Sequence, residues 1–154
     1  MKAAFTTGER AVEYGDFAEP RPCTGAEVVT MRAAALTNLD IVVAEGRHYL
    51  SPSDRPFVIG KEGVAILASG ERRYFPVGSL AHPFGSMAER SLALADRGLA
   101  VPDGISDALA AALGNAGLAA WLPLSWRARM RPGESVLILG ATGISGLIAV
   151  AAAK

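Results

Sequence analysis

Short apolar runs alternate with turn residues over the first hundred positions, a pattern that is typical of a β-rich domain. The runs predict strands over residues 2–5, 11–14, 27–35, 57–59, 64–68, 73–77 and 87–94. A short helix is predicted to begin at Asn38, whose side chain can accept a hydrogen bond from a free helix N–H, and to end at Gly46. We therefore expect a small irregular β-barrel or sandwich.

Beyond residue 105 the pattern changes to longer helical stretches. Ser106 is predicted to cap a helix over 107–113, and Pro123 should kink a second helix over 116–130. Residues 135–139 are apolar on both faces, as a central strand of a parallel sheet would be. A glycine-rich turn and a helix from about residue 144 follow, so we expect one domain over residues 1–130 and the first β-α unit of another over 131–154.

Composition narrows the class of protein. Of the 154 residues, 51% are hydrophobic and 19% are charged, which excludes intrinsic disorder. Fifteen basic and fifteen acidic residues give a net charge of zero, so neither nucleic acid nor an anionic membrane surface is an expected partner. The single cysteine, Cys23, excludes an internal disulfide and a multi-cysteine metal site.

One uncharged stretch, residues 135–153, is long enough to span a membrane. Gly140, Gly143 and Gly146 interrupt it, however, and favour a buried strand, a turn and a buried helix instead. The first ten residues also lack the apolar run of a signal peptide. We therefore expect a cytoplasmic protein with no membrane partner.

The turn over residues 140–146 reads GATGISG and lies between a predicted strand and a predicted helix, the context that a dinucleotide-binding fingerprint requires. Free N–H groups and the helix dipole would bind a pyrophosphate there. Gly143 would let the backbone approach the phosphates, and Gly146 would let the helix pack closely on the strand. The pattern departs from G-x-G-x-x-G only at Ala141, and a plain tight connection remains the alternative.

A lone strand and helix cannot bury their apolar faces, so we expect the chain to be a fragment or a natural truncation. The acidic or basic residue that would choose between NAD and NADP should lie about 20 residues beyond the turn. The residues predicted to hold the cofactor are Gly140, Ala141, Thr142, Gly143, Ile144 and Gly146, with Asn115 as a further cofactor-side residue.

Six short segments occur along the chain in the following order: MKA at 1–3, AALTNLD at 34–40, GKEG at 60–63, FGSMAE at 84–89, GNAGLAAW at 114–121, and RPGE leading into LGATG at 131–143. Together they resemble the medium-chain dehydrogenase/reductase superfamily, particularly its zinc-independent quinone oxidoreductase branch. The resemblance implies a mostly β, GroES-like irregular barrel with a few helices, followed by the start of a truncated Rossmann domain. It also implies hydride transfer from NADP(H), in preference to NAD(H), to a quinone or an activated C=C or C=O bond. The resemblance is also compatible with a homodimer of the full-length protein.

Zinc enzymes of this superfamily carry a cysteine before the Asp of the early helix and a histidine before the Glu that follows. Here those positions hold Thr37 and Lys61, neither of which is a zinc ligand, and the four cysteines of a structural zinc site are also missing. We therefore expect no metal. An alcohol dehydrogenase and a non-enzymatic GroES-like binding or assembly module remain alternatives.

Without zinc, hydrogen-bond donors or a cation must stabilise a developing oxyanion. The candidates are Tyr49, Asn38 and Lys61. Each has a purely structural alternative: a half-buried loop aromatic for Tyr49, a helix cap for Asn38, and an ion pair with Glu62 or another acid for Lys61. A structural role is also expected for Asp40, as a tie that holds its loop in place, and for His82, whereas His48 is expected to be solvated.

Overall fold

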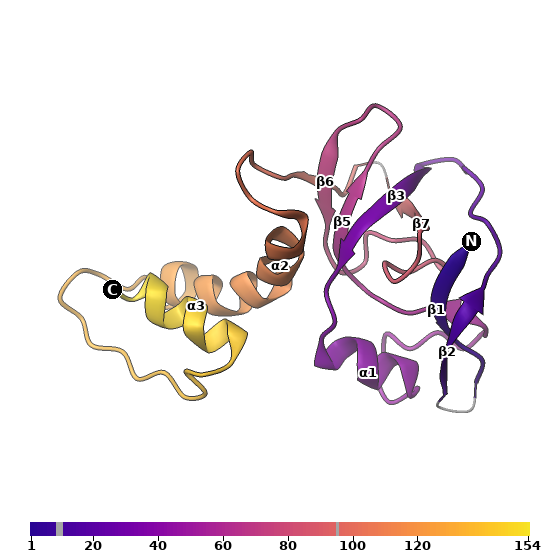
Figure 1. Ribbon diagram of the computed structural model, residues 1–154. Helices are drawn as coiled ribbons and strands as arrows, with labels where there is room; N and C mark the ends of the chain where they lie inside the picture. Colours follow the sequence, from indigo (N-terminus) through magenta and orange to yellow (C-terminus); the bar gives the residue numbers. More distant parts are fainter. Residues whose placement is uncertain (9–10, 95) are drawn as a thin grey trace. The chain divides into compact units, whose positions relative to one another are not determined.

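The computed structural model describes residues 1–8, 11–94 and 96–154, which divide into two compact units, Met1–Ala112 and Leu113–Lys154. Two antiparallel sheets make up most of the first unit (Figure 1). The smaller has the order β2-β1-β4, from strands β1 (Lys2–Thr6), β2 (Val12–Asp16) and β4 (Phe57–Val58). The larger has the order β7-β3-β5-β6-β8, from β3 (Ala26–Ala34), β5 (Gly63–Ile66), β6 (Arg72–Phe75), β7 (Arg90–Leu94) and β8 (Leu99–Ala100).

Strand β3 holds the larger sheet together, because it pairs with β7 along one edge and with β5 along the other. Its inward side chain Val29 packs in a buried cluster with Ala65, Phe75 and Ala93. A second cluster of Val43, Ala44, Phe57 and Ile59 lies under helix α1 (Asn38–Ala44). The apolar alternation in the sequence thus places the core between strands that are distant in the chain.

The predicted β-rich fold class is confirmed, and each predicted strand of the first hundred residues has a counterpart in the sheets. The strands form two antiparallel sheets rather than a closed barrel. Strand β8 was not anticipated, because its two residues are both exposed and carry no alternation to detect. The predicted early helix is also confirmed, although its N-cap is Thr37 and not Asn38.

The two helices predicted over 107–113 and 116–130 are one continuous helix, α2 (Asp107–Leu122), followed by the π-helical segment η1 (Pro123–Arg127). Its N-terminus is capped as expected, since Ser106 Oγ accepts a hydrogen bond from the Leu109 N–H at 3.2 Å. At the other end the Pro123 carbonyl accepts a hydrogen bond from the Ala128 N–H at 2.8 Å. Proline cannot donate to the preceding turn, and the chain continues from there as the wider π-helical segment η1, so the predicted kink stays a prediction.

Residues 135–139 do not form the predicted strand, although helix α3 (Ile144–Ala152) begins at the predicted residue. A strand needs a neighbour for its N–H and C=O groups, and none of the described strands pairs with this segment. Leu137 and Leu139 are consequently 85% and 86% exposed. The predicted β-α unit is thus present as an irregular segment, a turn and a helix.

One helical stretch, Asp107–Arg127, has a length and a mean hydropathy of 1.3 that would also suit a membrane span. The uncharged stretch singled out in the sequence, 135–153, instead contains a helix of nine residues, which is too short to span a bilayer. The predicted domain boundary at residue 130 and the cytoplasmic location stay predictions.

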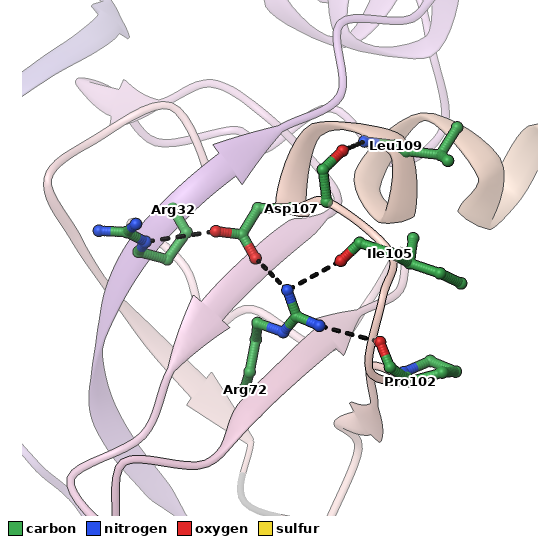
Figure 2. A network of polar contacts seen from close by, with 7 residues as sticks. Arg32, Arg72, Pro102, Ile105, Asp107 and Leu109 are labelled. Carbon is green, nitrogen blue, oxygen red and sulfur yellow. Dashed lines mark hydrogen bonds and ion pairs between the residues drawn. The ribbon is translucent and has the colours of Figure 1, made fainter.

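A network of charged hydrogen bonds fixes the start of α2 to the larger sheet (Figure 2). The guanidinium of Arg72, on β6, donates to the carbonyls of Pro102 and Ile105, each at 2.9 Å, and to the Asp107 carboxylate at 3.2 Å. Arg32, on β3, donates to the other oxygen of the same carboxylate at 3.3 Å. Two strands and the first turn of α2 therefore share one carboxylate, whose position also suits the helix dipole.

We expect Arg72→Met to lower the free energy of unfolding by about 2 kcal/mol, because it leaves two carbonyls and a partly buried carboxylate without their charged donor. Urea denaturation followed by circular dichroism measures this change. The matched control is Arg97→Met, which removes an arginine whose only described ion pair, with Asp96, is highly exposed. The control should change stability by less than about 0.5 kcal/mol, and equal effects of the two substitutions would contradict the assignment.

Candidate functional site

The N-terminus of α1 is fixed by Asp40, which is 2% exposed. One carboxylate oxygen, Oδ2, accepts hydrogen bonds from the backbone N–H and the hydroxyl of Thr37, both at 2.8 Å. The other, Oδ1, accepts one from the backbone N–H of Lys61 at 2.9 Å. A single buried carboxylate thus joins the start of α1 to the loop before β5, in agreement with the structural role expected for Asp40.

The ammonium of Lys61 lies over the ring of Phe57, with Nζ at 5.8 Å from the ring centroid. Burial lowers the pKa of this ammonium from its ordinary value, while the negative charge of Asp40 acts in the opposite direction. In the part of the chain that the structure describes, no carboxylate lies within ion-pairing distance of Nζ. The Glu62 carboxylate, one of the expected partners of Lys61, accepts a hydrogen bond from the hydroxyl of Tyr74.

Lys61 lines a cavity of about 310 Å³ in the first unit. The walls are mostly apolar, and include Leu50, Pro52, Phe57, Val58, Val77, Leu80, Pro83 and Phe84. His82 is the other basic group on the lining, and its Nε2 lies 2.9 Å from Oδ2 of Asp54. This contact holds the pKa of the Asp54 carboxyl below its usual range. An apolar cavity with a few placed polar groups is the usual form of a small-molecule site.

Gly85, on the cavity lining, allows its backbone to pack closely against the backbone of residues 58 and 59. A Cβ at this position would lie 2.4 Å from the carbonyl oxygens of both Val58 and Ile59, on β4 and just after it. Backbone atoms cannot give way as a flexible side chain can, so only glycine fits. The glycine of the FGSMAE segment therefore serves the packing of the cavity wall.

The other two catalytic candidates, Tyr49 and Asn38, lie in more exposed surroundings than Lys61. Tyr49 is 88% exposed, and its ring packs against that of His48 with centroids 4.3 Å apart. His48 Nδ1 accepts a hydrogen bond from the Leu50 N–H at 3.1 Å, which makes this histidine part of the turn. Asn38 is the exposed first residue of α1. Neither Tyr49 nor Asn38 lines the cavity, and the catalytic roles of all three candidates stay predictions.

Two contacts in and near the cavity were not anticipated from the sequence. His82 was expected to be structural from its place beside Pro83, and its contact with Asp54 joins residues 28 positions apart that no local pattern connects. Arg55 was not singled out at all, although its guanidinium donates two hydrogen bonds of 3.1 Å to the carbonyl of Ala44 and lies 5.2 Å from the Phe57 ring centroid. Arg55 thereby closes the C-terminal end of α1, where a cation is favoured.

The glycine turn lies in the second unit, at the N-terminus of α3. Gly140 has a φ of +74°, and its carbonyl accepts a hydrogen bond from the Gly143 N–H at 3.1 Å. A Cβ on Gly146 would lie 2.1 Å from the Gly140 oxygen and 2.7 Å from Cα of Ala141, so the turn packs directly on the helix at this position. The sequence pattern predicts that its last glycine lets the helix pack on the preceding strand, whereas here the close neighbour of Gly146 is the turn at Gly140 and Ala141.

The same turn leaves room for an anion. Gly143 is the N-cap of α3 and, among the described residues, no side chain caps the N–H groups of the first helical turn. A Cβ on Gly143 would have the Gly140 oxygen as its nearest neighbour, at 3.6 Å, so the space above the turn is open. Open N–H groups at a helix N-terminus beside a glycine turn fit the pyrophosphate of a dinucleotide. Asn115 lies in the middle of α2, and its role as a cofactor-side residue stays a prediction.

No group of three or more potential metal ligands occurs in the described ranges 1–8, 11–94 and 96–154. The two positions compared with zinc ligands are used otherwise: the Thr37 hydroxyl donates to Asp40, and Lys61 carries an ammonium. The expectation of a zinc-free site stays a prediction.

We expect Asp40→Asn to lower the free energy of unfolding by about 2 kcal/mol, because an amide cannot accept from both Thr37 and Lys61 as the carboxylate does. The amide proton of Lys61 should then exchange faster with solvent, which hydrogen exchange measured by NMR reports directly. The control is Glu45→Gln, which alters an acid at the other end of α1 whose partner, Arg47, is exposed. An unchanged exchange rate of the Lys61 amide in the Asp40→Asn variant would show that the hydrogen bond from Lys61 to Asp40 does not hold this loop in place.

No family model matches the chain. It is 30% identical over 155 residues to the mycocerosic acid synthase-like polyketide synthase of Mycobacterium tuberculosis, and the match covers 94% of this chain and 7% of that protein. Among solved structures, the quinone oxidoreductase of Thermus thermophilus, whose structure is also known in complex with NADPH, matches with a TM-score of 0.84 and 34% identity, over 99% of this chain and 50% of that one.

A cobalt- and zinc-bound thermostable alcohol dehydrogenase from Pyrobaculum aerophilum has the same fold, with a TM-score of 0.82 and 24% identity over 99% of this chain and 56% of its own. The chain thus spans about half the length of the solved structures that it matches. The predicted resemblance is confirmed over both units: the chain has the fold of the N-terminal part of a quinone oxidoreductase-like medium-chain dehydrogenase/reductase.

Proposed function

We propose that the complete protein is a zinc-independent, NADP(H)-dependent oxidoreductase that reduces a quinone or an activated C=C or C=O bond. The observation that carries this proposal is the close contact of Gly146 with Gly140 at the uncapped N-terminus of α3. The NADPH complex of the Thermus thermophilus quinone oxidoreductase supports the choice of cofactor. Under this proposal the partner is a small molecule, and the protein is cytoplasmic.

The residues of the turn, Gly140 to Gly146, would hold the pyrophosphate through the open N–H groups at the start of α3. The nicotinamide, when bound, supplies the hydride for the reaction. Gly146 contributes by keeping the turn against the helix, because any side chain there would push the Gly140 carbonyl outward. The chain's share in cofactor binding is therefore made mostly by backbone, with Asn115 as a further contact.

Lys61 would act on the substrate. When hydride adds to a carbonyl or to a conjugated C=C bond, an oxygen atom gains negative charge before it takes a proton from solvent. The Lys61 ammonium lies on an apolar cavity, where a charge interacts more strongly than it does in water. Tyr49, in the loop after α1, and Asn38, its first residue, are the further candidate donors in this proposal, although neither lines the cavity.

The test measures NADPH and NADH oxidation by the complete protein with a panel of quinones and enones. We expect turnover with NADPH, and a fall in kcat/KM of about 100-fold in Lys61→Met, the usual cost of removing one oxyanion donor. Absence of both cofactor binding and turnover would contradict the proposal.

The role of the turn is tested separately by Gly146→Ala, which should weaken NADPH binding by about tenfold or more, since it displaces the hydrogen-bonded turn. Its control is Gly117→Ala in α2, where an added Cβ meets nothing within 4 Å. Fluorescence titration with NADPH measures both. Equal affinities of the two variants for NADPH would show that the Gly146 contact does not contribute to cofactor binding.

A further inference from the structure

We infer that the cavity beside Lys61 binds flat, apolar molecules that carry one anionic oxygen group, such as aromatic carboxylates or phenolates, and that Lys61 and His82 hold the anion. The inference deepens the proposed function, and rests on it in so far as the bound anion would take the place of the oxyanion that develops during reduction. Three observations carry it: the grouping of basic side chains, the lack of a described ion pair at Lys61, and the size and lining of the cavity.

The basic side chains gather around one buried ring. Phe57, 1% exposed, has the Arg55 guanidinium carbon at 5.2 Å from its ring centroid, the Lys61 Nζ at 5.8 Å and the His82 ring at 6.0 Å. Arg55 is occupied by the Ala44 carbonyl and the Thr6 hydroxyl. The other two lie on the cavity lining, so they are the groups that a ligand can reach.

None of the described acids forms an ion pair with the Lys61 ammonium. Asp40 accepts its hydrogen bonds from Thr37 and the Lys61 backbone, and Glu62 accepts one from Tyr74. Asp54, whose carboxylate is 74% exposed to solvent, contacts His82, so Lys61 is the basic group of the cavity lining that has no described acid partner. Burial lowers the pKa of Lys61, which reflects the cost of taking an ammonium out of water, and the negative charge of Asp40 offsets this cost only in part. A ligand anion would remove that cost.

The size and lining of the cavity determine what the rest of the ligand, apart from its anionic group, must look like. A volume of about 310 Å³ lies at the lower end of small-molecule sites, and suits a molecule of one or two rings. Apart from Lys61 and His82, its side chains are aliphatic, aromatic or proline, and they can bury the faces of a flat ring. A wholly polar anion such as inorganic phosphate would leave these walls without a partner.

The test compares benzoate with benzyl alcohol, which has the same ring and no charge, by isothermal titration calorimetry on the unmodified chain. We expect benzoate to bind about tenfold more tightly, the effect of one charge-assisted hydrogen bond. Lys61→Met should abolish this preference, and His82→Gln should reduce it. The control Lys2→Met removes an ammonium that pairs with Asp16 on the smaller sheet, and should keep the preference.

A second measurement does not depend on any variant. The chain has three lysines, Lys2, Lys61 and Lys154, so isotope-labelled lysine gives few NMR signals, and benzoate should shift that of the Lys61 side chain while benzyl alcohol should not. Equal affinity for the two molecules, or an unshifted Lys61 signal, would overturn the inference. Selective benzoate binding without any NADPH turnover would reject the proposed function alone, and turnover without selectivity would reject this inference alone.

Discussion

The arrangement around the cavity depends on one buried carboxylate. Asp40 lies in the first turn of α1 and accepts three hydrogen bonds, two from Thr37 and one from the backbone of Lys61. A buried charge is tolerated only when it is well supplied with donors, so the helix start and the loop before β5 must come together around it. The position of the Lys61 side chain on the cavity wall follows from this constraint on its backbone.

The same constraint explains the electrostatics of the site. Because the nearest acid is satisfied by backbone and hydroxyl donors, it is not available as an ion-pair partner for the Lys61 ammonium. The next acid along the chain, Glu62, is engaged with Tyr74. The fold therefore supplies a half-buried cation and keeps its neighbouring acids occupied. An ammonium in such a position interacts strongly with any oxygen that becomes negative in front of it.

Local patterns in the sequence were sufficient where the physics is local. Strand alternation, the Ser106 cap and the start of α3 were all predicted, because each depends on a few neighbouring residues. The cap of α1 is a local feature that was assigned one residue too late: it is Thr37, whose backbone is extended, with a φ of −123°, and whose hydroxyl donates to Asp40. Contacts between distant residues were not predictable in this way. Nor could the contact of His82 with Asp54 be inferred from spacing.

The glycine turn shows how a backbone angle can resolve an ambiguity in a sequence pattern. Read as G-x-G-x-x-G, the turn has Ala141 where the first glycine should be, which weakens the match. In the structure the positive φ of the turn, +74°, falls on Gly140, so the residue that must be glycine for the tight turn is glycine. Gly146 then makes the close approach to that same residue. The tight turn and the close packing that the outer glycines of the pattern provide are therefore both present, and the tight turn falls one position earlier than Ala141, at Gly140.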